Sequence, residues 1–139
     1  MEYRKFENTI VLRVQKGEDI VAKIAEVADF EKIKLGSISG LGATNNFTVG
    51  FFDTNTRIYH KENHRGDHEI ISLLGNITRK DGEVYLHLHI ACADESGRFV
   101  GGHLNEAFVS ATSEIFITVI DGEVGRVLDD NIGLNLMSF

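Results

Sequence analysis

Residues 73–93 read LLGNITRKDGEVYLHLHIACA, a pattern that predicts two paired β-strands. Asp81-Gly82 is a strong signal for a two-residue hairpin turn between two strands. If Lys80 pairs with Glu83, side chains alternate along the strands and produce two faces. One face is apolar and is expected to be buried, and the opposite face is the more polar of the two. The expected pairs on the apolar face are Ile77–Leu86, Gly75–Leu88 and Leu73–Ile90, and those on the other face are Ser72–Ala91, Leu74–His89, Asn76–His87 and Thr78–Tyr85.

The more polar face carries two histidines, His87 and His89. Alternate residues of a strand project from the same face about 7 Å apart, so both imidazoles can approach one metal ion. The alternative interpretation is that they are strand histidines without a ligand, which is common for an isolated pair. Asn76 falls across from His87 in the expected register, and we predict that it orients this histidine from outside the coordination sphere.

A third histidine extends the pair to a predicted metal site. The turn signal at 94–97 ends in glycine, which suits the positive φ often needed there. If residues 95–97 form the loop, Asp94 pairs with Arg98 and His89 falls opposite His103, with Cβ atoms about 5 Å apart. Three histidines that leave one coordination position open are typical of catalytic zinc, so we expect a divalent metal, with zinc as the best match to the ligands.

One helix and a succession of strands account for the rest of the chain. Apolar residues at helical spacing predict a helix from Glu18 to about Lys32, lying across a sheet. Together with the strands this indicates an α+β fold. No repeat or linker interrupts the sequence, so we expect a single domain over residues 1–139. The expected strands cover residues 9–14, 34–39, 47–53, 57–60, 69–78, 84–93, 98–102, 109–120 and 124–128.

Composition limits the class of protein. The 139 residues are 42% hydrophobic and 25% charged, which is enough for a core without disulfides. Cys92, the single cysteine, falls on the apolar face and is expected to be a buried thiol. Neither a membrane-spanning run nor a signal peptide is recognisable, so we expect a cytoplasmic protein without membrane contact. The formal net charge of −7 disfavours a cationic nucleic-acid surface.

Gly40-Leu41-Gly42 resembles the start of a dinucleotide-binding loop. Such a loop needs a third glycine and must open a helix, whereas strand-like residues follow here. We therefore expect a turn at this position and no phosphate site.

Several segments in this order and spacing resemble the plant-and-prokaryote conserved (PPC) domain over nearly the whole chain. The likeness is to stand-alone prokaryotic members and implies a central, largely antiparallel sheet, one main helix packed on it, and a homotrimer. It also implies that His87, His89 and His103 are metal ligands. Glu69 and Glu114 fit the family pattern and are the expected acid/base residues. The segments are SGLGA (39–43), GFFD (50–53), HEIISLLGNI (68–77), LHLH (86–89), GGHL (101–104) and TSE (112–114).

Self-association is also suggested by the number of phenylalanines on the expected strands. They exceed what one sheet face and one helix need to cover, so some are expected to meet a neighbouring subunit. They are Phe47, Phe51, Phe52, Phe99, Phe108 and Phe116.

Two functions fit these expectations. A more distant likeness is to acetolactate decarboxylase, which is similar in fold and holds zinc with a His-x-His pair and a third histidine, so one function is metal-dependent chemistry on a small oxygen-rich substrate. The other is a DNA-associated or regulatory oligomeric scaffold, because the plant domain accompanies AT-hooks. An AT-hook needs an Arg-Gly-Arg-Pro core, and the sequence contains no proline. We therefore expect no specific DNA binding by this chain alone.

Overall fold

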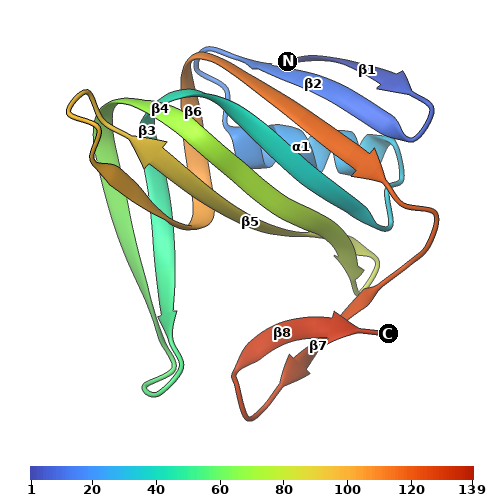
Figure 1. The fold of residues 1–139 in the computed structure, drawn as a ribbon. Coiled ribbons are helices and arrows are strands. Elements are labelled where there is room, and N and C mark those ends of the chain that lie inside the picture. The colour runs from blue at the N-terminus through green and yellow to red at the C-terminus, as the bar shows by residue number, and fades with distance from the viewer.

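The computed structural model describes residues 1–139 and confirms an α+β fold built on an antiparallel sheet. In chain order its elements are β1 (Glu2–Phe6), β2 (Thr9–Gln15), α1 (Ile20–Phe30), β3 (Gly36–Asp53), β4 (Ile58–Lys80), β5 (Glu83–Ala93), β6 (Phe99–Val119), β7 (Gly125–Asp129) and β8 (Leu134–Ser138). Six strands form one sheet in the order β1-β2-β6-β3-β4-β5, and β7 and β8 form a separate hairpin. Figure 1 shows α1 packed on one face of the large sheet. This helix is neither long nor apolar enough to cross a membrane.

Asp19 fixes where α1 begins. Its carboxylate accepts hydrogen bonds from two backbone N–H groups of the first turn and a third from Ala107 on β6, at 2.9 Å. The side chain therefore caps the helix and ties it to the sheet. The helix begins at Ile20 instead of the expected Glu18, because the residue before it is the cap, and it ends at Phe30.

Strands β3, β4 and β6 are each longer than expected. We predicted two shorter strands in place of each, including a turn at Gly40-Leu41-Gly42, and this prediction was wrong. Gly42 lies inside β3, where the pairing with β4 shifts register, and a second shift follows between Thr44 and Asn46. A β-bulge breaks the alternation of apolar and polar residues without ending the strand, so the sequence pattern looks interrupted where the chain is not. The sequence pattern also missed β1 and β8.

The two hairpins around β5 have the expected registers. Lys80 pairs with Glu83 at one turn. At the other turn Gly97 has a φ of 78°, and His89 pairs with His103. Because β5 pairs with both β4 and β6, the sheet curls back on itself and brings strands from both hairpins to one site.

The face of the sheet that packs against α1 forms the core. Cys92 is completely buried there, as expected, and burial raises the pKa of its thiol to about 12. We call the opposite face, which points away from α1, the outer face; it includes His87 and His89. The buried strand residues of the core include Ile10, Leu12, Val14, Ile38, Leu73, Ile77, Leu88, Ile90, Ile115 and Ile117.

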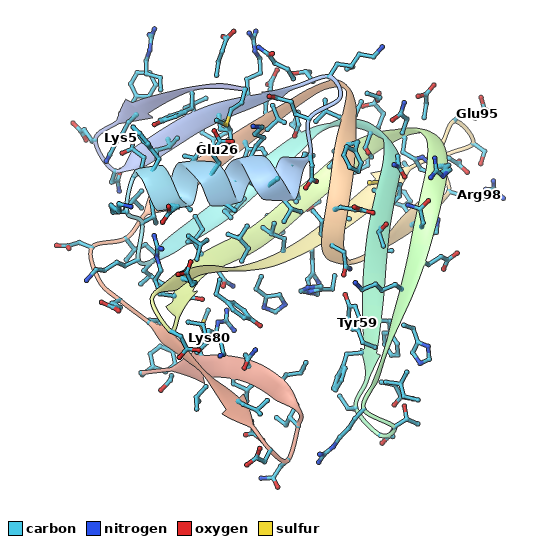
Figure 2. All side chains as sticks on the ribbon, turned by 180° about the vertical axis from the view of Figure 1, so that it is seen from behind. Lys5, Glu26, Tyr59, Lys80, Glu95 and Arg98 are labelled. Atoms are coloured by element: carbon cyan, nitrogen blue, oxygen red, sulfur yellow. The ribbon has the colours of Figure 1, made fainter.

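Two hairpins extend beyond the curled sheet (Figure 1). One, which we call the arm, is formed by the far ends of β3 and β4 around the turn at 54–57. The other is the C-terminal hairpin β7-β8. Figure 2, seen from the α1 side, labels Tyr59 on the arm and Lys80 near the C-terminal hairpin. The arm and the C-terminal hairpin therefore flank the sheet on opposite sides.

Candidate metal site

Three histidines converge where β5 meets β6. His87 and His89 are neighbours on the outer face of β5, and His103 pairs with His89 across the ladder. One ring nitrogen from each lies within 4.8 Å of the others. The ring centroids are 5.1 Å apart for His87 and His89, 5.2 Å for His87 and His103, and 5.6 Å for His89 and His103. The structure thus brings together the three residues that the sequence predicted as ligands.

The donor set fits one divalent ion. At Zn–N distances of about 2.0–2.1 Å, tetrahedral geometry places ligand nitrogens about 3.4 Å apart. The imidazoles need small rotations toward one another to reach this spacing. The group contains three histidines and no carboxylate. Such a set leaves a fourth position open for water or a ligand.

Burial favours the neutral, metal-binding form of two of these imidazoles. Desolvation lowers the pKa of His87, with smaller contributions from the neighbouring His89 and from Arg126. Desolvation also lowers the pKa of His103, and the other two histidines act in the same direction. The neutral imidazole is the form that coordinates a metal, so a lowered pKa extends its range toward acid pH.

Arg126 lies beside the histidines, a position that the sequence analysis did not predict. Asn76 pairs with His87 as expected, and its carboxamide oxygen accepts a hydrogen bond from the Arg126 Nη2 at 2.8 Å. The Arg126 Nε donates to the Thr78 hydroxyl at 3.0 Å, and the guanidinium lies 4.9 Å from the centre of the Tyr85 ring. No local signal identifies Arg126, because its partners lie about 50 residues earlier in the chain.

Tyr59, on the arm, borders the histidine cluster on the side opposite Arg126. Its ring meets the His103 ring edge to face at 6.0 Å between centroids, and its hydroxyl accepts a hydrogen bond from Asn105 at 2.8 Å. The ring lies directly over Gly50, the partner of His103 on β3, where any Cβ would overlap the phenol. Glycine at this position therefore gives the tyrosine its place beside the site.

Neither expected acid/base residue lies at the site within one chain. Glu69 pairs with Ala93, four residues beyond His89 on β5, which corresponds to about 13 Å along the strand. Glu114 lies on the distant half of β6, where it pairs with Arg13 on β2. The structure assembles the histidines but not these carboxylates.

Fold and site together define an antiparallel α+β protein with a three-histidine cluster on its outer face. A model of the Plants and Prokaryotes Conserved (PCC) domain, also abbreviated PPC, matches residues 1–121, and the chain belongs to this family. Arg126 lies beyond the matched residues. A comparison with curated proteins gives no significant match.

Solved structures of similar proteins cover nearly the whole chain. A Bacteroides thetaiotaomicron protein provisionally described as DNA-binding is 30% identical, with a TM-score of 0.97 over 99% of this chain and 96% of that chain. A metal-containing protein from Archaeoglobus fulgidus is 31% identical, with a TM-score of 0.89 over 99% and 97%. A PPC protein from Pyrococcus horikoshii is 29% identical, with a TM-score of 0.86 over 99% and 94%.

The more distant likeness to acetolactate decarboxylase is one of fold. The Bacillus subtilis enzyme is 14% identical, with a TM-score of 0.52 over 84% of this chain and 54% of that chain. The shared fold confirms the expected structural relationship.

Proposed function

We propose that this protein is a cytoplasmic homotrimer that binds one divalent ion through His87, His89 and His103, with zinc as the native metal. Its proposed activity is metal-dependent chemistry on a small, oxygen-rich substrate. An ion at this position supplies Lewis-acid activation of a carbonyl oxygen or of bound water.

The observation that carries this proposal is the approach of one nitrogen from each of three imidazoles to within 4.8 Å. Unrelated surface histidines repel one another when protonated and gain nothing from such convergence. The metal-containing relative from Archaeoglobus fulgidus supports the same interpretation.

The proposed acid/base residues are Glu69 and Glu114. Because both are remote from the histidines of their own chain, we propose that a neighbouring subunit of the trimer brings one of them to the site. Both carboxylates are exposed and lie on the outer face together with the histidines. Asn76 is proposed to act on His87 through the Arg126 contact instead of directly.

Metal analysis tests the site. Protein purified without chelators is expected to carry about one zinc per chain, and protein stripped of metal is expected to recover that occupancy on dialysis against zinc. The double variant His87→Ala/His89→Ala should lose it, whereas the control His60→Ala, on the exposed arm, should retain it. Occupancy that stays well below one after reconstitution, or full occupancy in the double variant, would contradict the assignment.

The second candidate function is a DNA-associated or regulatory scaffold. It is favoured by the relative from Bacteroides thetaiotaomicron that is provisionally described as DNA-binding. The net charge of −7 weighs against it, because non-specific DNA affinity comes from clustered Lys and Arg. If turnover of a substrate stops on chelation, the enzyme is favoured; DNA binding that survives chelation favours the scaffold.

A further inference from the structure

We propose that Arg126 makes the three-histidine site selective for a small carboxylate, which binds with one oxygen at the open metal position and the other on the guanidinium. This inference rests on the proposed metal site and specifies the class of ligand that the site accepts.

The contacts of Arg126 place its guanidinium on the face that carries the histidines. Asn76 accepts its Nη2 hydrogen bond and lies directly across the ladder from His87. Tyr85, which lies under the guanidinium, is two residues before His87 and shares its face of β5. The positive charge is therefore fixed next to the predicted ligands, although Arg126 comes from the separate β7-β8 hairpin.

Arg126 is held rigidly but keeps unused hydrogen-bonding capacity. An arginine has five N–H donors. Three are used, by Asn76, by Thr78 and by the backbone carbonyl of Asn135 at 3.2 Å. Two donors remain. Because the side chain is already ordered by these bonds and by the Tyr85 ring, binding an anion costs little further side-chain entropy.

No carboxylate of the protein neutralises this guanidinium. None of the ion pairs in the structure involves Arg126, and its three acceptors are a carboxamide, a hydroxyl and a backbone carbonyl, all uncharged. The histidine cluster also lacks a carboxylate. A divalent ion bound by neutral imidazoles would add a second centre of positive charge. A chain with a net charge of −7 therefore presents a local cationic site, which favours an anionic ligand.

A purely structural role for Arg126 is the competing interpretation. The three hydrogen bonds also attach the C-terminal hairpin to β4, and a neutral side chain of similar length could make some of them. The two interpretations differ in how removal of the Arg126 charge changes ligand binding. Loss of a tether alone affects charged and uncharged ligands alike, whereas loss of the anion partner affects only the charged one.

Cobalt substitution provides the readout. Co²⁺ in a three-histidine site gives visible absorption bands that change when a ligand enters the open position. We would titrate the cobalt-loaded protein with lactate and with lactamide, which has nearly the same shape but no charge. We expect lactate to shift the bands with at least tenfold higher affinity than lactamide. Equal affinities on the unmodified protein would overturn the proposal, whatever the behaviour of any variant.

Two variants then test whether the preference for lactate over lactamide comes from the guanidinium. Arg126→Gln should weaken lactate binding at least tenfold and leave lactamide binding within twofold, because a charge-assisted hydrogen bond is lost. Thr78→Val removes one attachment of the hairpin but keeps the charge, and should change lactate affinity less than threefold. Equal losses in both variants would overturn the proposal in favour of a tether. If the wild-type protein gives no cobalt bands, the metal site itself fails; bands that lactate does not change reject only this inference.

Discussion

Arg57, at the tip of the arm, donates a hydrogen bond from its Nη2 to the backbone carbonyl of Asn131, at the tip of the C-terminal hairpin, over 2.8 Å. The same side chain and the Phe52 ring also lie 3.6 Å from the position that a Cβ would take on Gly133. The two extensions that flank the histidine face therefore meet at their ends. This contact is exposed and rests on few groups, so it is expected to open more readily than the core.

The first prediction concerns this contact. Arg57→Ala should increase amide hydrogen exchange in β7 and β8 while changing the free energy of unfolding by less than about 1 kcal/mol, because the bond is solvent-exposed. Hydrogen exchange followed by mass spectrometry measures both hairpins in one experiment. Arg65→Ala, on β4 and without a contact to the C-terminal hairpin, is the control. Unchanged exchange in β7 and β8 would mean that the Arg57 contact does not restrain the C-terminal hairpin.

The second prediction concerns the stability of the metal-free protein against pH. Burial lowers the pKa of His87 and of His103 below their ordinary value of 6.5 in the folded chain. Between the lowered values and 6.5, the unfolded chain binds more protons, so the free energy of unfolding rises with pH across this window. We expect stability to be greatest above about pH 6.5 and to fall as the pH drops through the window.

Urea denaturation at several pH values in the presence of EDTA measures this dependence. The double variant His87→Gln/His103→Gln should lose part of the slope between the lowered pKa values and pH 6.5. His60→Gln is the control and should retain it. A slope of opposite sign, or one that the double variant leaves unchanged, would show that these two histidines do not carry the effect.

The grouping of the three histidines could be predicted from the sequence because two short turns set the pairing of their strands. The Asp81-Gly82 turn fixes the pairing of β4 with β5, and the loop before Arg98 fixes the pairing of His89 with His103. Both are short hairpins, in which turn length sets the register. The convergence of three histidines on two adjacent strands follows from these two turns and the alternation of side chains.

The features that could not be predicted depend on contacts between distant parts of the chain. Arg126 reaches the site only because β7-β8 folds back onto β4, and its hydrogen bond to Asn76 spans 50 residues. The continuity of β3 was hidden by its bulges at Gly42 and after Thr44. The remoteness of Glu69 and Glu114 could not be judged from spacing, because their separation from the histidines is set by strand registers far from either turn.

The third prediction concerns nucleic acid. We expect weak, non-specific binding of duplex DNA at physiological salt, because the chain has a net charge of −7 and no AT-hook core. Fluorescence anisotropy with a labelled AT-rich duplex and a scrambled duplex of equal length measures affinity and selectivity together. Tight binding that distinguishes the two duplexes would make the DNA-associated scaffold the leading function.

The last prediction is trimeric assembly, and the outer face gives its physical basis. His89, Leu74, Ser39 and Phe116 form one row across β5, β4, β3 and β6. In this row and beside it the apolar side chains remain open to solvent: Leu74 is 56% exposed, Phe116 49% and Leu41 54%. Phe47, in contrast, is completely buried in the core of its own chain. An exposed apolar surface that begins at a proposed metal ligand is one that a second copy can cover while closing the site.

Size exclusion with light scattering at several concentrations tests this assembly. We expect a mass three times that of the 15.5 kDa chain. The double variant Leu74→Arg/Phe116→Arg should shift the mass toward that of one chain, because it places two charges in the proposed interface. Phe30→Arg is the control, since Phe30 is 74% exposed at the end of α1, on the other side of the sheet, and this variant should remain trimeric. A single-chain mass at every concentration would reject the trimer and with it the supply of Glu69 or Glu114 by a neighbouring subunit, while the three-histidine site of each chain would stand.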